Sequence, residues 1–187
     1  MPHTDMLERD LAVLVVVDFQ EKMLAAVGTA PSDAISMNVA RLIKVARILD
    51  VPVLHTEQYP LGLGPTVEAV RTVLGTGLEP IIKTTCSCWR DAAFRQALEA
   101  TKREHVVLAG LESHICIQQT VLDLIRVDYV PFVAADATGS RRVGDMNQAL
   151  ARMRHAGAAV STTEALIFEW IERCDHPRFR DVLKVVK

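Results

Sequence analysis

The sequence predicts a single α/β domain of three layers, α/β/α, in which a mainly parallel, doubly wound sheet lies between two layers of helices. Short aliphatic and β-branched runs alternate with longer segments whose apolar residues recur every three or four positions. Half of the 187 residues are hydrophobic, which suffices for one sizeable core. Strand–helix alternation of this kind is typical of parallel strands joined by right-handed crossovers.

Six apolar runs are the expected strands. The run Leu11–Val17 contains no polar residue and is rich in valine, which is typical of a strand covered on both faces. The run His105–Leu111 is almost as apolar and should also be a buried strand. In chain order the expected strands are Leu11–Val17, Val51–Thr56, Pro80–Thr84, His105–Leu111, Tyr129–Ala135 and Ala158–Ser161.

The segments between these strands are expected to be helices or surface loops. Ala34–Leu49 has an apolar side with helical spacing and a capping residue at Ser32 or Asp33. The Gly- and Pro-rich segment Tyr59–Pro65 should be a loop. Further helices are expected at Thr66 to about Leu74, Arg90–Ala100, Ile115–Ile125 and Asp145–Ala156. After the sixth strand we expect a helix that ends at Arg173 and a final turn or helix from Pro177. We expect one domain over 1–187, with its core at about 11–173 and a C-terminal extension at 174–187.

Net charge and cysteine content indicate which ligands and which cellular compartment to expect. A formal net charge of −2 offers no basic face for nucleic acid or an anionic membrane. The first ten residues carry four charged side chains and no apolar run, so we expect no secretion signal. Four cysteines in a chain of this length favour free thiols in a cytoplasmic protein. The expected partner is a small-molecule substrate, with no nucleic acid and no membrane.

Three chemically useful residues follow strands of the expected sheet. Asp18 comes after the first strand, Lys83 ends the third, and Cys116 lies just past the fourth. Parallel sheets bind ligands beyond the carboxyl ends of their strands. These three side chains should therefore share one edge of the sheet.

Together the three residue types suit hydrolysis through a thiol nucleophile. The thiol of Cys116 would attack an electrophilic carbon, Asp18 would transfer protons, and Lys83 would hold the carboxylate charged. A cysteine in the first turn of a helix should have its pKa lowered below about 8.5. Each residue also has a structural explanation, since the carboxylate can cap a loop, the lysine can face solvent and the thiol can pack in the core.

Neighbouring residues are candidates for the walls of a substrate pocket. They are Phe19, Gln20, Tyr59, Trp89 and Ile115. Among them Tyr59 is favoured, because an aromatic side chain with a polar tip suits a partly wet site. Phe19 and Ile115 could equally belong to the core.

Other polar residues carry weaker predictions. Cys86 and Cys88 lack the Cys-x-x-Cys spacing of redox pairs and are expected to line the pocket instead. His55 and Glu57 are too few for a metal site, which needs three or four convergent ligands, so we expect no metal and no cofactor. We expect His114 to point away from the nucleophile.

Six segments carry a family resemblance, three to a superfamily and three to one of its branches. VVVDFQEKM, IIKTTCSCW and LAGLESHICIQQTVLDL resemble the isochorismatase-like cysteine hydrolase superfamily. TEQYPLGLGPT, STTEALIFEW and HPRFRDV are similar to its isochorismatase domain-containing branch. The resemblance implies a flavodoxin-like topology with Asp18, Lys83 and Cys116 as catalytic triad. It also implies a cis peptide between Leu111 and Glu112, with the N–H groups of Glu112 and Cys116 directed at the oxyanion.

The predicted function is that of a metal-independent cysteine hydrolase for a small amide, imide or vinyl ether. One alternative is a non-catalytic or redox-sensing thiol protein on the same fold. A second is isochorismatase or nicotinamidase proper. The segment from His55 to Tyr59 departs from the Asp-x-His…His metal site of nicotinamidases, and the site-facing loops show no clear basic cluster for two substrate carboxylates. The resemblance also implies a homo-oligomer, a dimer or higher.

Overall fold

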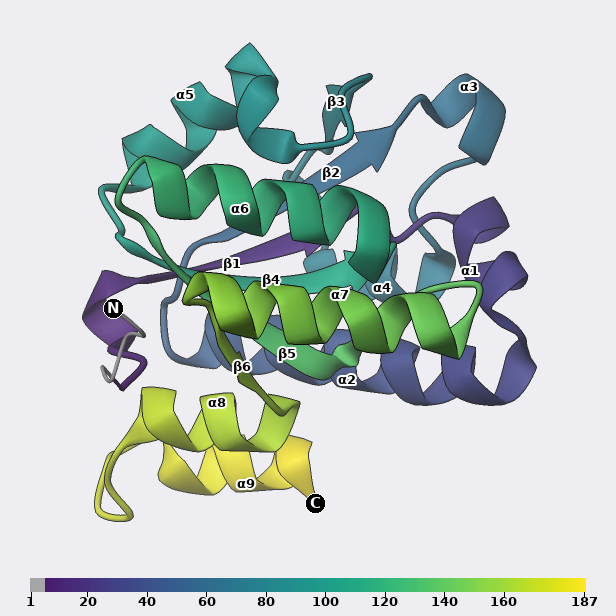
Figure 1. Cartoon of the computed structure of the whole chain (residues 1–187). Helices are drawn as coiled ribbons and strands as arrows, with labels where there is room; N and C mark the ends of the chain where they lie inside the picture. The colour runs from purple at the N-terminus through teal and green to yellow at the C-terminus, as the bar shows by residue number, and fades with distance from the viewer. Residues whose placement is uncertain (1–5) are drawn as a thin grey trace.

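The computed structural model describes residues 6–187 and forms a parallel sheet between two layers of helices (Figure 1). The strand order is β3-β2-β1-β4-β5-β6, and every adjacent pair is parallel. The strands are β1 Ala12–Val17, β2 Val53–Gln58, β3 Ile81–Lys83, β4 His105–Leu111, β5 Val130–Gly139 and β6 Ala159–Ser161. The predicted three-layer, doubly wound class is confirmed.

The direction of winding reverses between β1 and β4, which lie side by side at the centre of the sheet. The flavodoxin-like expectation holds for the layers and for the parallel, doubly wound sheet. The order of the strands is the 3-2-1-4-5-6 order of dinucleotide-binding folds, because β2 and β3 are added outward on one side and β4 to β6 on the other. The β1–β4 boundary is the switch point at which such sheets bind ligands.

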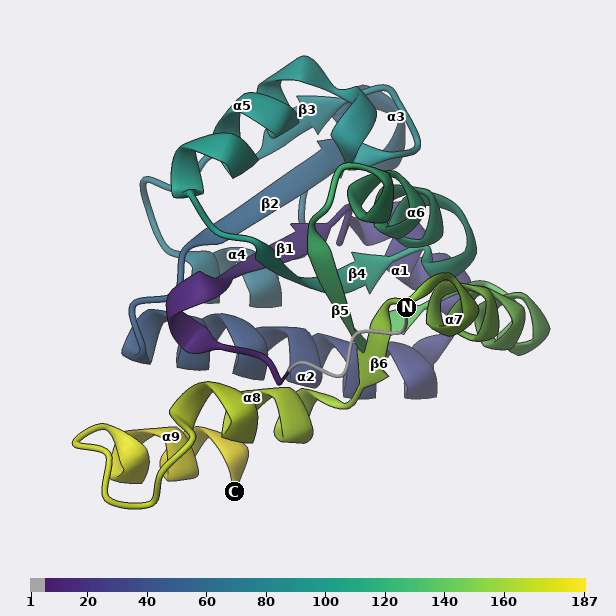
Figure 2. The ribbon, with the colours of Figure 1, turned by 60° about the vertical axis from the view of Figure 1, so that its left-hand side comes forward.

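Two sets of helices cover the two faces (Figure 2). One face carries α1 Glu21–Val27, α2 Thr29–Ile48, α4 Glu68–Leu74, α8 Thr163–Ile171 and α9 Phe179–Val186. The other carries α5 Ala92–Thr101, α6 Gln118–Arg126 and α7 Val143–Ala156. A short helix, α3 Pro60–Leu63, lies in the loop after β2.

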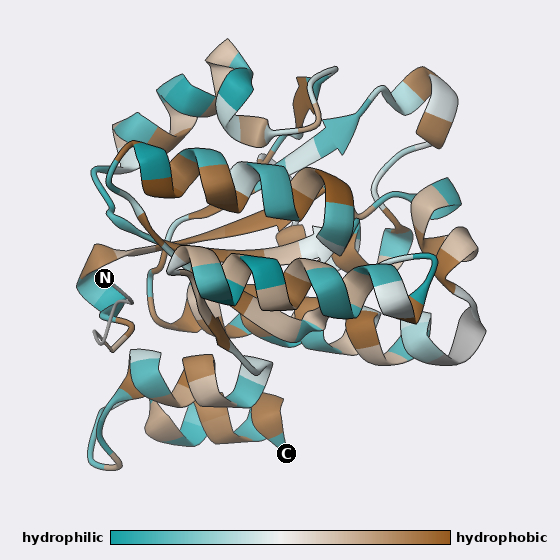
Figure 3. Ribbon diagram, viewed as in Figure 1, coloured by the Kyte–Doolittle hydropathy of each residue, from teal (hydrophilic) through white to brown (hydrophobic). Residues whose placement is uncertain are grey.

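The central strand shows why both faces are apolar. Successive side chains of a strand point to opposite faces. Leu14 and Val16 of β1 pack into the core with α2, whereas Val13 and Val15 pack into the core with α5 and α6. Hydrophilic and hydrophobic residues alternate along α6 and α7 in Figure 3, as expected of helices with one face on a sheet.

The largest departures from the expected elements lie next to the carboxyl edge. Strand β2 runs through Gln58, two residues beyond the expected end, and β5 runs through Gly139 after a register shift near Gly110. The helices α1 and α3 were not expected. Asp136, the first residue beyond the expected fifth strand, lies inside β5 and accepts hydrogen bonds from the N–H and the hydroxyl of Thr163 at 2.7 and 2.9 Å.

Gly110 permits the close approach of β4 to β1 at the switch point. Its φ of +121° lies in a region that L side chains rarely adopt, and a Cβ there would overlap the backbone of Val17. The residue pairs with Val17 in the sheet. No other residue type could occupy this position without separating the two strands that carry the site.

The C-terminal segment packs onto the sheet's helical layer. Helix α9 lies beside α2 and α8, and its Val182 is buried in the same core (Figure 1). Within residues 6–187 no helix has both the length and the apolar composition of a membrane span. Homo-oligomer formation stays a prediction of the sequence.

Candidate active site

Cys116 lies in a single π-helical turn, Ser113–Ile117, that follows β4 and continues into α6. The N–H of Ile117 closes the turn by donating to the Glu112 carbonyl at 3.2 Å. Turns of this type occur frequently at functional sites. Because β4 adjoins β1 at the reversal of strand order, the turn faces the crevice where doubly wound sheets bind ligands.

Asp18 is fully buried at the end of β1, where the chain turns sharply at a φ of +46°. Its N–H lies 3.2 Å from both the carbonyl and the hydroxyl oxygen of Thr56 on β2. The Thr56 hydroxyl donates its proton to Asp18 Oδ1 at 2.7 Å. One carboxylate oxygen is thereby fixed by the neighbouring strand, and the other faces Lys83.

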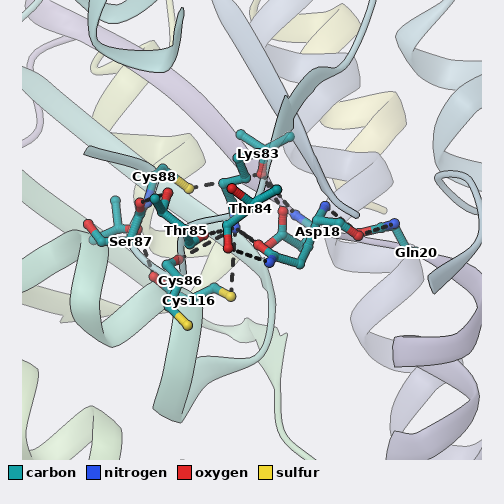
Figure 4. A network of polar contacts seen from close by, with 12 residues as sticks. Asp18, Gln20, Lys83, Thr84, Thr85, Cys86, Ser87, Cys88 and Cys116 are labelled. Carbon is teal, nitrogen blue, oxygen red and sulfur yellow. Dashed lines mark hydrogen bonds and ion pairs between the residues drawn. The ribbon is translucent and has the colours of Figure 1, made fainter. Parts of the chain in front are cut away.

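Lys83 reaches this carboxylate from the end of β3 (Figure 4). Its Nζ lies 2.6 Å from Asp18 Oδ2, 2.7 Å from Gln58 Oε1 and 3.8 Å from Cys116 Sγ. Neither side chain of the ion pair is exposed. Burial is the largest single cause and lowers the pKa of Lys83, but the charge and hydrogen bond of Asp18, together with smaller contributions from Cys88 and Cys116, outweigh it, and the net pKa is raised. The ammonium therefore stays charged, and the three expected residues lie together.

The pKa of the Cys116 thiol is raised above its ordinary value, which contradicts the expected lowering by a helix N-terminus. Burial is the largest cause and the negative charge of Asp18 the second, and together they outweigh the opposing charge of Lys83. Cys116 is 5% exposed and precedes α6 instead of occupying its first turn. The resting nucleophile is thus a thiol, and a hydrogen bond joins it to the Asp18 carboxylate.

A cavity of about 370 Å³ opens beside Cys116. This volume falls in the range of small-molecule sites. Its lining comes from segments that follow β1, β3, β4 and β5 and from the end of β2 and the loop after it: Lys22, Met23, Ala26, Gln58, Leu63, Cys86, Glu112, Ile115, Cys116 and Arg141. The cavity therefore lies on the carboxyl edge of the sheet, as the placement of the three residues predicted.

Ile115 lines this cavity, but Phe19 and Gln20, also expected in its wall, have other positions. The Phe19 ring is fully buried in the core that contains α2. The Gln20 amide donates to the carbonyls of Gln58 and Gly64 at 3.1 and 2.6 Å and accepts from the N–H of Gln58 at 2.7 Å. Gln20 thus ties the chain after β1 to the end of β2, because a buried amide must satisfy its hydrogen bonds.

Tyr59 and Trp89 also have positions other than those expected. Tyr59 is 56% exposed, and its ring lies against Gly62 in the loop after β2. Trp89 packs on Tyr129 with ring centroids 5.6 Å apart and contacts the core below α5 and α6. Both aromatic rings find apolar neighbours outside the cavity.

The cavity residues that sequence reasoning missed lie mainly on unexpected elements. Lys22, Met23 and Ala26 belong to α1, and Arg141 follows the extended end of β5. Ala26 follows Met23 by three positions and Lys22 by four, which is compatible with one helix side and was a usable signal. No signal in the sequence indicated that Arg141 would turn back toward the cysteine.

The three cysteines of the site differ in environment. Cys86 lines the cavity together with Cys116, as expected, but Cys88 is fully buried. Burial, followed by the charge of Asp18, raises the pKa of Cys88 to about 12. Figure 4 shows the sulfur atoms of Cys86 and Cys116 on one side of the network and that of Cys88 on the other.

His114 lies two residues before the nucleophile, and its imidazole contacts a different loop. Its Nδ1 is 2.9 Å from the Ser140 hydroxyl, on the loop after β5. The Thr120 hydroxyl connects the backbones of the two cysteine segments: it donates to the Cys116 carbonyl at 2.7 Å and accepts from the Cys88 N–H at 2.8 Å. The cysteine backbone is thereby held from α6.

His55 and Glu57 point away from the ion pair. Thr56 and Gln58 contact Asp18 and Lys83, so the residues that alternate with them on β2 belong to the opposite face. The Glu57 carboxylate accepts from both the N–H and the hydroxyl of Thr66, at 2.6 and 2.7 Å. Among the described residues no group of three or more His, Cys, Asp or Glu side chains is arranged to hold a metal ion.

The peptide bond between Leu111 and Glu112 is cis. It stands at the start of the turn that carries Cys116. The Glu112 side chain is paired with Arg141, whose Nε and Nη2 donate to its two carboxylate oxygens at 2.7 and 3.3 Å. An oxyanion role for the N–H groups of Glu112 and Cys116 stays a prediction.

A buried carboxylate–lysine pair beside a thiol, at the switch point of a parallel sheet, is an arrangement consistent with the triad of a cysteine hydrolase. The chain belongs to the isochorismatase domain family, whose profile matches residues 12–165. The resemblance found in the sequence is confirmed.

Named relatives and solved structures agree with this membership. Human isochorismatase domain-containing protein 2 is 41% identical over 177 residues, which cover 94% of this chain and 83% of the human protein. A structure described as MAR1 ribonuclease from Caenorhabditis elegans has a TM-score of 0.90 and 34% identity, covering 97% of this chain and 92% of that one.

A more distant structure shows the same fold. It is the YcaC gene product of Escherichia coli, described as an octameric hydrolase of unknown specificity. Its TM-score is 0.86 at 23% identity, with 100% of this chain and 98% of that chain covered. The likeness extends over the whole described chain, including the C-terminal helices.

Proposed function

We propose that this chain is a metal-independent cysteine hydrolase that acts on a small amide, imide or vinyl-ether substrate through a covalent bond to Cys116. The observation that carries the proposal is the contact geometry of Cys116, which lines the cavity, with the buried Asp18–Lys83 pair beside it; we call these three residues the floor. The Lys83 ammonium lies within 3.8 Å of the sulfur and 2.6 Å of the Asp18 carboxylate, beside a cavity of small-molecule size.

For an amide substrate, Asp18 can carry out every proton transfer that the reaction needs. Asp18 takes the thiol proton as the sulfur attacks the carbonyl carbon, and the N–H groups of Glu112 and Cys116 stabilise the oxyanion. Asp18 then returns the proton to the leaving nitrogen as the C–N bond breaks. A water molecule attacks the resulting thioester, with Asp18 again as base, and releases the acid and the thiol.

Because the pKa of Cys116 is raised, the scheme requires Asp18 to remove the thiol proton. A thiol that remains protonated at neutral pH must lose its proton during attack, and the Asp18 carboxylate is the group hydrogen-bonded to this thiol. Lys83 keeps that carboxylate charged and oriented. Gln58, which accepts from Lys83 Nζ and lines the cavity, is a positioning residue for the lysine.

Metal independence is supported by the orientation of β2. The side chains of His55 and Glu57 lie on the strand face opposite the residues that contact Asp18 and Lys83, and Glu57 is engaged by Thr66. A nicotinamidase-type metal site after the second strand would require ligands on the cavity side. We therefore place nicotinamidase below the other candidates.

The name of the C. elegans relative raises RNA as a substrate. Nucleic-acid sites bind the phosphate backbone through several Lys and Arg side chains. The net charge here is −2, and the residues that line the cavity include two cations and one carboxylate. We favour a small-molecule substrate for this reason.

The redox-sensing alternative is favoured by one observation, that Cys86 and Cys116 line the same cavity. A sensor would use these two thiols and would not require Asp18. Peroxide treatment followed by mass spectrometry tests this function. A Cys86–Cys116 disulfide that forms equally in wild type and in Asp18→Asn would favour the sensor.

The decisive experiment compares alkylation with turnover in Asp18→Asn. Removing the carboxylate removes one cause of the raised pKa and leaves the Lys83 charge beside the sulfur, so Cys116 should react faster with iodoacetamide at pH 7. Hydrolysis, measured in a screen of small amides, imides and vinyl ethers, should fall by at least about a hundredfold. Turnover that survives in Cys116→Ala would sink the proposal, as would an Asp18→Asn variant with full activity.

A further inference from the structure

Three charged side chains line the cavity beside Cys116, and they come from three different segments. Lys22 belongs to α1, Glu112 to the turn after β4, and Arg141 to the loop after β5. Two cations against one carboxylate leave the lining with one net positive charge. The buried pair below, Asp18 and Lys83, is neutral in itself.

Arg141 is oriented by Glu112 but keeps donors for a ligand. The guanidinium uses Nε and Nη2 to contact the two carboxylate oxygens. An arginine has five N–H donors in a fixed fork, so three remain, two on Nη1 and one on Nη2. The Arg141 side chain is 56% exposed, whereas that of Glu112 is 10% exposed, so the cation reaches solvent and its partner lies below it. We call the charged lining formed by Lys22, Glu112 and Arg141 the mouth of the cavity.

Lys22 stands at the mouth on a different element. Its Nζ donates to the carbonyl of Gly62 in α3 at 2.7 Å, which leaves two further donors on the ammonium. Most of the remaining lining is apolar, Met23, Ala26, Leu63 and Ile115, and Gln58 and Cys86 supply the rest. The cavity is thus apolar in its body and positive in net charge at its opening.

We propose that the substrate of this hydrolase carries a single carboxylate, bound by Arg141 and Lys22 at the mouth, while its electrophilic carbon faces Cys116. The inference rests on the proposed function and deepens it by naming the substrate class. One net positive charge matches a monoanion, and the planar fork of Arg141 matches a carboxylate. A dianionic phosphate would exceed the charge available, and a neutral amide would leave the spare donors unused.

Two alkylating agents of nearly equal size measure this preference without a known substrate. Iodoacetate carries a carboxylate where iodoacetamide carries an amide. Both form a bond from sulfur to carbon, expel iodide and release the thiol proton to solvent. The quantity to measure is the ratio of their rate constants at Cys116, by peptide mass spectrometry. Exposed Cys174, in the same molecule, supplies the reference ratio.

The ratio of iodoacetate to iodoacetamide at Cys116 should exceed that at Cys174 by about tenfold at low salt, and it should fall as salt is added. Arg141→Gln should lower it by at least about fivefold and Lys22→Gln by about twofold. Arg141→Lys, which keeps the charge, should keep at least half of the preference. The matched control is Arg142→Gln, since Arg142 is exposed and is not among the residues that line the cavity; it should leave the ratio unchanged.

Equal ratios at Cys116 and Cys174, or a ratio that Arg141→Gln leaves unchanged, would overturn the inference. An equal fall in Arg142→Gln would overturn it too, because the effect would then come from general surface charge. The proposed function fails by a different result, namely hydrolysis that survives in Cys116→Ala. The two failures are therefore distinguishable, and the carboxylate preference can fail while the hydrolase function stands.

Discussion

The floor and the mouth of the cavity each contain an ion pair, but the two pairs differ in exposure. Neither Asp18 nor Lys83 exposes any of its side chain, whereas Arg141 leaves 56% of its side chain in solvent while it contacts Glu112. Breaking a buried pair leaves an uncompensated charge without water, but an exposed pair contributes little to stability. The floor is therefore part of the fold, whereas the exposed mouth has donors left for a ligand while its ion pair stays in place.

The largest expected effect comes from Lys83→Met. The substitution leaves the buried Asp18 carboxylate without its cation, and we expect the free energy of unfolding to fall by about 3–5 kcal/mol. Urea denaturation followed by circular dichroism measures it. The matched change at the mouth, Lys22→Met, should give no measurable loss, because the Lys22 side chain is exposed.

The double variant Asp18→Asn/Lys83→Met separates charge from packing. With both charges gone the stability should recover by more than half of the loss, since the penalty is that of an unpaired charge. Hydrolysis should not recover. A double variant less stable than Lys83→Met would contradict the comparison, because the pair would then act mainly through its packing.

The second effect is a loss of stability at alkaline pH that originates in the two buried thiols, Cys116 and Cys88. The folded chain holds the protons of Cys116 and Cys88 more tightly than the unfolded chain, because burial raises the pKa of both thiols. Their contribution is complete below the unfolded pKa of about 8.5 and is lost as pH rises from there toward the folded values. The free energy of unfolding should fall by up to about 1.4 kcal/mol per pH unit for each thiol.

Denaturation at pH 8, 9 and 10 tests this slope. Cys116→Ala should reduce it, whereas Cys86→Ser should not, since Cys86 is exposed at the same cavity. A slope that is the same in wild type and in Cys116→Ala would contradict the assigned environment of the thiol.

The positions of Asp18, Lys83 and Cys116 after apolar runs in the sequence were enough to predict the floor. Asp18, Lys83 and Cys116 each follow an apolar run, and a parallel sheet brings the carboxyl ends of all its strands to one edge. The rule holds whatever the order of the strands, which the sequence did not specify. This is why the floor was predicted although the strand order 3-2-1-4-5-6 was not.

The mouth could not be predicted in the same way. Its position depends on where an element ends, and β2 and β5 run beyond their expected ends, to Gln58 and Gly139. Tertiary contacts extend them, since Gln58 is held by Gln20 and β5 resumes pairing with β4 at Gly110 after a register shift. Arg141 follows that shift, so no local pattern located its side chain.

The pKa of Cys116 shows a similar limit. The rule of helix N-termini concerns one local field, whereas the thiol responds first to burial and then to Asp18. Burial is a property of the packed chain and was not visible in the segment around the cysteine.

The smallest expected effect concerns Tyr59, the wall residue that the sequence favoured most. Its phenol ring is 56% exposed and lies against Gly62 instead of in the lining of the cavity. Tyr59→Phe removes only the hydroxyl, so we expect kcat/KM for a substrate found in the amide screen to change by less than about twofold. Met23→Ala shortens a side chain that lines the cavity and should raise KM by about tenfold, because the substrate loses apolar contact. If Tyr59→Phe had the larger effect, the loop after β2 would have to close over the ligand, and the division between a buried floor and an exposed mouth would need to include that loop.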